Sequence, residues 1–268
     1  MPAPMKKFFT VLLVLALIAL ATILLWRATP SLSDLPTGPK PPTRNAAEET
    51  PVLHVGSTVL PLSAALDGSR EDAYTKVTVQ LENPGPGNLS LVADFADDIL
   101  SGYADAFDPT RLSAEDQQII AASAAGKYTL DLVGKKTAGL GGRWSYRLEV
   151  ASYTGGAHGS FVVSARSYSQ GGDALSLAEA TGLRDPLTAL ANAVKPRLLD
   201  AVISKTRGQG GEAYQPDEDF NGGTAPTSEN YSTWYLDGGD IVVVFNQYQI
   251  GSYALGEHEI GVPLASLR

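Results

Sequence analysis

The sequence predicts an α+β fold in which antiparallel sheets carry helices packed on one face, preceded by one N-terminal transmembrane helix. Short segments in which apolar and polar residues alternate indicate strands, and segments whose apolar residues recur at helical spacing indicate helices. Parallel β-α-β repeats do not dominate this pattern, so antiparallel pairing is expected. An uncharged apolar run near the N-terminus supplies the membrane helix.

That apolar run covers residues 8–26 and is long enough to span a bilayer. A cleaved signal peptide would have a shorter apolar core followed by a small-residue cleavage site, whereas the Ala-x-Ala at residues 19–21 lies inside the run. We therefore expect residues 1–27 to form a cytoplasmic tail and an uncleaved anchor. Lys6 and Lys7 place the N-terminus inside, so the body is expected outside the inner or plasma membrane, in a periplasmic position.

A proline-rich stalk is expected at residues 28–51, because this stretch holds six prolines and almost no apolar side chains. At a polyproline rise of ~3.1 Å per residue it reaches at most roughly 70 Å. The folded body then covers residues 52–268, with an N-terminal module at about 52–168 and a C-terminal module at about 169–268.

In the first part of the body, residues 52–62 and 74–81 are expected to be strands. After the Pro-Gly breaker at 83–87, apolar residues at helical spacing predict a helix over 91–103. Ser113 and Asp116 make a capping box for a second helix that ends near Gly126. Because these two helices follow the strands in the chain, we expect both to pack on one side of a sheet.

A hairpin with a glycine-rich turn is expected next. Residues 127–133 and 143–153 form a strand pair around a loop at 134–142, and the second of these strands returns through residues 153–159 into a strand at 161–165. Gly155 and Gly156 can adopt positive φ and bring His158 close to a neighbouring backbone or a bound partner. His158 is therefore either a binding residue or a side chain that stabilises its own turn.

The C-terminal part predicts one long helix and a further sheet. Asp185 caps a helix that begins at Pro186, and its apolar stripe continues past Pro196, which should bend it. Residues 234–236 and 241–245 form a hairpin whose second strand is buried on both faces. In the last strand, Glu257 and Glu259 are expected on one face and His258 on the other.

The long connection at residues 204–230 lacks periodicity, and such loops are usually functional or mobile. Within it, Asp217, Asp219 and Asn221 precede Gly222 in the arrangement of a calcium-binding loop. Ser228 at the twelfth position and the flanking prolines do not fit an EF-hand. A plain acidic loop is the alternative.

The net charge and the amino-acid composition of the chain limit the classes of molecule that it can bind. The chain carries a net charge of −9, and without the three basic residues that flank the apolar run the remaining 17 basic and 29 acidic side chains give −12. Nucleic acid is therefore excluded as a partner, whereas a basic protein would be attracted. The chain has no cysteine, which excludes disulfides, thiolate metal sites and a cysteine nucleophile. No cofactor is indicated.

Two sequence blocks carry a family resemblance. The block Tyr-Thr-Gly-Gly-Ala-His-Gly at residues 153–159 and the ending at 234–260, which closes on Val-Pro, resemble the RsiV-like extracytoplasmic domain. The same modules resemble those that precede the catalytic domain of PdaC-type peptidoglycan deacetylases. In the anti-sigma factor RsiV this domain is a receptor for lysozyme, a basic protein. Because no sigma-binding or deacetylase domain is expected, the resemblance implies the binding module alone on a membrane tether.

Two functional classes follow. As a binding or sensory module of the cell envelope, the chain would bind lysozyme, another basic envelope protein or cell-wall glycan. The turn at 155–159 and residues 248–256 are then expected to share a surface, and the candidate binding residues are Gly155, Gly156, His158, Tyr248, Tyr253 and Glu257.

The alternative is an envelope hydrolase or metal-dependent enzyme. It would use His54, His158 or His258 with carboxylates such as Glu257 and Glu259. None of the three histidines has a neighbour at a metal-binding spacing, and no Gly-x-Ser-x-Gly is present. We therefore expect a binding module rather than an enzyme.

Overall fold

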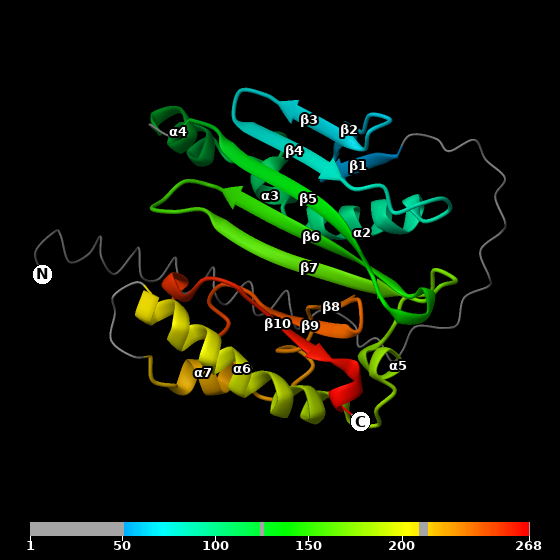
Figure 1. The fold of residues 1–268 in the computed structure, drawn as a ribbon. Coiled ribbons are helices and arrows are strands. Elements are labelled where there is room, and N and C mark those ends of the chain that lie inside the picture. The colour runs from blue at the N-terminus through cyan, green and yellow to red at the C-terminus, as the bar shows by residue number, and fades with distance from the viewer. Residues whose placement is uncertain (1–50, 124–125, 209–213, 268) are drawn as a thin grey trace, which may run out of the picture. The chain divides into compact units, whose positions relative to one another are not determined.

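The computed structural model describes residues 51–123, 126–208 and 214–267, which belong to one compact unit. Within them, strands form a five-stranded sheet in the order β3-β4-β5-β6-β7, a three-stranded sheet in the order β10-β9-β8, and the hairpin β1-β2 (Figure 1). The strands are β1 Val52–Val55, β2 Thr58–Pro61, β3 Asp67–Glu71, β4 Thr75–Leu81, β5 Tyr128–Ala138, β6 Trp144–Tyr153, β7 Ser160–Tyr168, β8 Trp234–Asp237, β9 Asp240–Phe245 and β10 His258–Pro263.

The helices are α2 Leu89–Ser101, α3 Ala104–Phe107, α4 Ala114–Ala122, α5 Leu177–Thr181, α6 Pro186–Gly208 and α7 Glu218–Gly223, with short 3₁₀ helices η2 Leu140–Gly142, η3 Tyr253–Leu255 and η4 Leu264–Leu267. The predicted α+β class is confirmed. The predicted membrane segment at 8–26 and nearly all of the stalk at 28–51 lie outside the described residues. Among the described helices, none is both long enough and apolar enough to cross a membrane.

The five-stranded sheet is mixed rather than purely antiparallel. β4 and β5 run parallel, with Val77 opposite Leu130, while every other pair in this sheet is antiparallel. Parallel neighbours need a long crossover connection, and the segment that contains α2, α3 and α4 supplies it. The prediction of antiparallel pairing is therefore wrong at this one pair.

The first core lies between this sheet and α2. The helix buries Val92, Phe95 and Leu100 against side chains of β4, β5 and β6. Of the residues whose spacing predicted this helix, Phe95 is buried, whereas Leu91, Ile99 and Tyr103 are partly buried at the edge of the core. β5 extends to Ala138 and so includes most of the stretch predicted as a loop. Gly134 permits this, because a Cβ there would lie 2.6 Å from Cε1 of Tyr146, whose ring fills the space above the strand.

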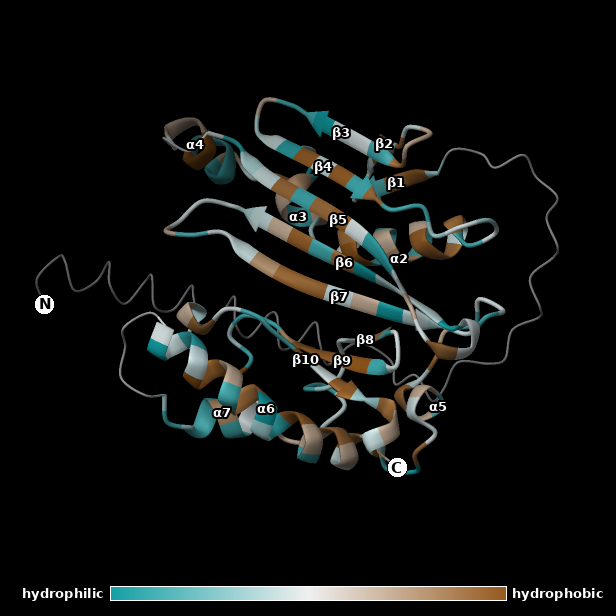
Figure 2. Ribbon diagram, in the orientation of Figure 1, coloured by the Kyte–Doolittle hydropathy of each residue, from teal (hydrophilic) through white to brown (hydrophobic). Residues whose placement is uncertain are grey.

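The second core lies between α6 and the three-stranded sheet, whose strands are largely hydrophobic (Figure 2). Val194 and Leu198 are both fully buried, so the apolar stripe stays packed on either side of Pro196 as predicted. β9 is buried on both faces, which confirms that prediction. The predicted loop at 204–230 is partly helical, because α6 continues to Gly208 and α7 follows.

The two sheets also contact each other. Val163 of β7 packs against Tyr235, Val242 and Val244, which lie on the face of the second sheet that α6 leaves free. Phe161 and Ala165 extend this contact. The C-terminal sheet therefore has one face against α6 and the other against the N-terminal sheet, which explains why β9 consists almost wholly of apolar residues.

An ion network crosses this contact between the sheets. Arg147 of β6 binds Oε1 of Glu149 at 2.6 Å and also pairs with Glu259 of β10. The Tyr235 hydroxyl donates to Oε2 of Glu259 at 2.9 Å. The side chains of Arg147, Glu149 and Glu259 are only 17, 19 and 29% exposed, so solvent screens this network weakly.

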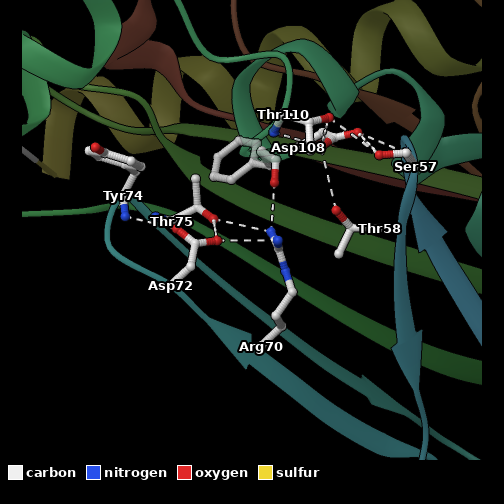
Figure 3. Close-up of polar contacts among 9 residues, drawn as sticks. Ser57, Thr58, Arg70, Asp72, Tyr74, Thr75, Asp108 and Thr110 are labelled. Atoms are coloured by element: carbon white, nitrogen blue, oxygen red, sulfur yellow. Dashed lines mark hydrogen bonds and ion pairs between the residues drawn. The ribbon is translucent and has the colours of Figure 1, made fainter. Parts of the chain in front are cut away.

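A second polar cluster fastens the β1-β2 hairpin to the end of α3 (Figure 3). The buried carboxylate of Asp108 accepts hydrogen bonds from the backbone N and Oγ of Ser57 at 2.7 and 2.8 Å, and from the backbone N and Oγ1 of Thr110 at 3.0 and 2.7 Å. Burial alone would raise the pKa of Asp108, but these hydrogen bonds outweigh it and hold that pKa well below its usual range.

Nearby, Arg70 joins β3 to α3. Its guanidinium donates to the carbonyl of Phe107 at 2.6 Å and pairs with Asp72 at 3.2 Å (Figure 3). Protein donors thus surround the carboxylates of both Asp108 and Asp72. The bonds from Ser57 to Asp108 hold the hairpin in place.

We predict that Asp108→Asn lowers the free energy of unfolding by about 3 kcal/mol, because an amide nitrogen would face donors that now bind a carboxylate. Urea unfolding at neutral pH measures this loss. The matched control is Asp105→Asn, which removes an exposed partner of Arg111 and should cost less than about 0.5 kcal/mol.

The same variant has a defined pH dependence. Because the pKa of Asp108 is lower in the folded state, its contribution is present above the unfolded pKa of about 4 and is lost as the pH falls below that value. The parent should therefore approach the stability of Asp108→Asn in acid. Equal stability of the two proteins at neutral pH would contradict this account.

We predict that Arg147→Met lowers the free energy of unfolding by about 2 kcal/mol, since Glu259 would lose its cation while Glu149 would keep only Lys135. A double-mutant cycle with Glu259→Gln should recover part of this loss, which identifies the pair as the cause. Arg111→Met is the control at an exposed pair. Additive effects of Arg147→Met and Glu259→Gln would show that the two side chains are not coupled.

Candidate functional site

The turn between β6 and β7 adopts the backbone that its glycines predict. Gly155 and Gly156 have φ values of 88° and 96°, which L side chains rarely adopt. The Tyr153 hydroxyl donates to the carbonyl of Gly156 at 3.1 Å and closes the turn. His158 follows on the exposed side of this turn.

His158 meets two tyrosines that lie about 90 residues further along the chain. Its ring stacks on Tyr253 with centroids 3.9 Å apart and planes 21° apart, and its Nε2 lies 3.4 Å from the hydroxyl of Tyr248. The two tyrosine rings are 5.8 Å apart. We call His158, Tyr248 and Tyr253 the aromatic cluster. The expected proximity of the turn and residues 248–256 is confirmed, whereas a binding role stays a prediction.

The hydrogen bonds of His158 define its tautomer. Nδ1 lies 2.9 Å from the carbonyl of Gly159, which can only accept, so Nδ1 carries the proton. Nε2 is then the acceptor for the Tyr248 hydroxyl. His158 therefore stabilises its own turn, as one of the two interpretations expected, and at the same time holds the tyrosines together.

The segment that carries Tyr248 is fixed by amide side chains at the edge of β7. Asn246 accepts from the backbone N of Val163 at 2.7 Å and donates to its carbonyl at 3.0 Å, as a neighbouring strand would. Gln247 accepts from the backbone N of Phe161 at 3.1 Å. These hydrogen bonds satisfy backbone groups at the free edge of β7 and place Tyr248 beside the turn between β6 and β7.

Tyr248 itself has an unusual conformation. Its φ is 68°, in the left-handed region that non-glycine residues seldom adopt, and it is 61% exposed. Gln249, the next residue, donates to the carbonyls of Gly223 and Asn230 at 3.3 and 2.9 Å. Tyr248 is thus held between two anchored amides with its ring in solvent, a strain that is often associated with function.

Glu257 and His258 do not contribute directly to this cluster. His258 is only 8% exposed, and its Nε2 is buried without a hydrogen-bond partner. Burial lowers the pKa of His258, and the Lys205 ammonium lowers it further, while Glu257 acts in the opposite direction. The predicted alternation of His258 and Glu259 is confirmed, since Glu259 instead meets Arg147 and Tyr235.

The third histidine has its own partner elsewhere. Nδ1 of His54 in β1 lies 3.0 Å from Oδ2 of Asp97 in α2, and the backbone N of His54 donates to the other oxygen at 2.7 Å. No local pattern predicts this pair, because 43 residues separate its members. Within the described ranges, no group of three or more metal-ligating side chains is arranged to hold a metal ion.

The residues of the calcium alternative form a helix start instead. Asp217 is the N-cap of α7 and accepts from the backbone N of Phe220 at 2.9 Å. The side-chain oxygen of Asn221 accepts from the Lys195 ammonium at 2.8 Å. Asp219 lies in the first turn of α7, so the three residues lie at the start of a helix and not in the extended loop of the calcium motif.

Comparison with known proteins identifies one domain. Residues 180–265, from the end of α5 to η4, match the family model described as "Protein of unknown function (DUF3298)". No curated protein matches the chain.

Two crystal structures of DUF3298 family proteins are similar to this chain. The one from Bacteroides fragilis NCTC 9343 is 18% identical, with 80% of this chain and 93% of that chain covered and a TM-score of 0.48. The one from Pseudomonas aeruginosa PAO1 is 19% identical, with 74% and 85% covered and a TM-score of 0.42.

Proposed function

We propose that this protein is a membrane-tethered binding module of the cell envelope and that the aromatic cluster is its contact surface. The observation that carries the proposal is the convergence of His158, Tyr248 and Tyr253 on the surface from two distant segments. Tyrosine rings with a polar tip contribute much of the energy at the centres of protein interfaces. An exposed, strained Tyr248 supports a role in recognition more than one in packing.

The partner class we propose is a basic protein. The net charge of −9 gives the chain an attractive field for a cationic partner, which speeds association. The resemblance of the 153–159 and 234–260 blocks to the RsiV-like domain supports lysozyme as the first partner to test. Cell-wall glycan lacks a comparable positive charge, so the same field would not favour it.

The tether in this proposal is the apolar run at residues 8–26 together with the stalk at 28–51. The proposal is an uncleaved anchor with the N-terminus inside and the body in the periplasm or outside the plasma membrane. A binder held this way would meet soluble envelope proteins close to the membrane.

We predict that Tyr253→Ala weakens binding of lysozyme to the full-length protein in detergent by about 30-fold, or roughly 2 kcal/mol, because it removes the ring that stacks on His158. Surface plasmon resonance measures the affinity, and circular dichroism checks the fold. The control is Leu140→Ala, which truncates an exposed apolar side chain in η2, at the opposite end of β6.

Three outcomes separate the alternatives. Parent-like lysozyme binding by both Tyr253→Ala and Tyr248→Ala would show that the aromatic cluster is not the contact surface. Binding of peptidoglycan fragments in place of lysozyme would identify glycan as the ligand. Turnover of those fragments by the parent, abolished in His158→Ala, would support the enzyme alternative.

We predict that association with lysozyme slows several-fold between about 50 and about 500 mM salt, while dissociation changes little, because screening acts on long-range attraction. Stopped-flow mixing at several salt concentrations measures both rates. A salt-independent association rate would show that the acidic body does not steer the partner.

We predict that the mature protein keeps its N-terminus and stays in the membrane fraction, since the apolar run lacks a cleavage site at its end. N-terminal sequencing and fractionation of cells test this. A mature chain that starts near residues 22–30, or release into the soluble fraction, would show that the run is a cleaved signal.

A further inference from the structure

The short helix η3, which carries Tyr253, is held in part by the buried side chain of His258. Tyr253 begins η3, and the carbonyl of Leu255 at the end of η3 accepts a hydrogen bond from Nζ of Lys205 in α6 at 2.6 Å. His258, three residues later, also hydrogen-bonds the backbone of Leu255. Two side chains therefore hold one peptide group, and that group fixes the short helix that presents Tyr253 to His158.

The hydrogen bond to Leu255 favours a protonated ring and raises the pKa of His258, but burial and Lys205 outweigh it, so the neutral form is favoured. Its Nε2 is buried and has no hydrogen-bond partner, so a proton added there would be desolvated and unpaired. Lys205 brings a positive charge from α6, and Glu257 brings a negative one from the same segment. The partner of His258 across the sheet is Phe245 of β9, which is apolar and offers no compensation.

We propose that His258 is an acid-sensitive support for the aromatic cluster: its neutral imidazole holds η3 in place, and its protonation releases the segment that carries Tyr253. The structural part of this proposal concerns residues 252–258 alone. Its consequence for a ligand rests on the proposed binding function.

The direction of the pH effect follows from the burial of the ring. Burial and Lys205 lower the pKa of His258 below its usual 6.5, so the unfolded or released segment binds a proton more readily than the ordered one. The ordered state is therefore fully favoured above the usual pKa and loses stability as the pH falls below it. Acid should release η3 while most of the fold stays intact.

Hydrogen exchange of the full-length protein tests this directly. The amides of Leu255 and Gly256 donate to the carbonyls of Ser252 and Tyr253 at 3.0 and 2.9 Å, so their protection reports on η3. After correction for intrinsic rates, we expect about tenfold less protection at about pH 5 than at about pH 7.5. Peptides from β9 should keep their protection and serve as the internal reference.

Substitutions at four positions identify the residue responsible. His258→Phe, or His258→Gln if the first does not fold, should remove the pH dependence. His158→Phe and His54→Phe should retain it, which separates the buried histidine from the exposed ones. Lys205→Met should lower the protection of η3 at both pH values, because it removes the hydrogen bond to Leu255. It should also weaken the pH dependence, because the ordered His258 would then bind a proton more readily.

The proposal is overturned if η3 is equally protected at both pH values in the parent, or if the pH dependence persists in the His258 variants. Lysozyme affinity, measured over the same pH range, should fall about tenfold in the parent and stay constant in His258→Phe. A pH-dependent η3 in a protein that binds no lysozyme at any pH would contradict the proposed function and leave the acid-sensitive support standing.

Discussion

The candidate site depends on how the two sheets contact each other, and Arg147 lies at the centre of that contact. It joins Glu149 of its own strand to Glu259 of the second sheet, with the Tyr235 hydroxyl on the same carboxylate. A partly buried ion network of this kind adds little net stability, because removing the charges from water offsets their attraction. The network acts mainly against other registers of the two sheets, since any shift of one sheet along the other would separate these charges.

Hydrogen bonds between the neighbouring strands of the two sheets reinforce the same register. The hydroxyl of Ser145 accepts from the backbone N of Leu236 at 2.8 Å, and Thr137 donates to the carbonyl of Leu236 at 2.6 Å. The backbone N of Gly238 then donates to the carbonyl of Ala138 at 2.7 Å. With β8 fixed in this way, β9 ends where Asn246 can meet the edge of β7, and the aromatic cluster forms as a consequence.

Sequence reasoning succeeded where one local pattern decides the structure. The apolar stripe of α6, the two buried faces of β9 and the positive φ of Gly155 and Gly156 all follow from residues close together in the chain. The meeting of the turn with residues 248–256 was also predictable. Its signal was that both segments combine glycine with histidine or tyrosine, where buried strands would use aliphatic residues.

The remaining features depend on partners that are distant in sequence. β3 consists of Asp-Gly-Ser-Arg-Glu, which has poor strand propensity, and it forms because β4 offers a free edge. Arg147 and Glu149 alternate as solvent-facing residues would, and nothing local indicates that a second sheet covers them. The acidic run at 217–221 fits both a calcium loop and a helix N-terminus. The capping bond from Phe220 to Asp217 and the contact of Asn221 with Lys195, 26 residues away, distinguish the two.

Packing of the cores explains the buried tyrosines of this protein, but it does not explain Tyr248. Two buried ones direct their hydroxyls to backbone carbonyls, Tyr146 to that of Glu82 at 2.6 Å and Tyr231 to that of Thr224 at 3.2 Å. Their rings fill cores, so folding alone explains them. Tyr248 also directs its hydroxyl to a protein acceptor, His158, but its ring lies largely in solvent. Its backbone is held in a left-handed conformation that costs about 1 kcal/mol. A glycine or asparagine would satisfy that backbone better. Outside the core the ring of Tyr248 contacts His158 and Tyr253, and these contacts are what folding of the core alone does not explain.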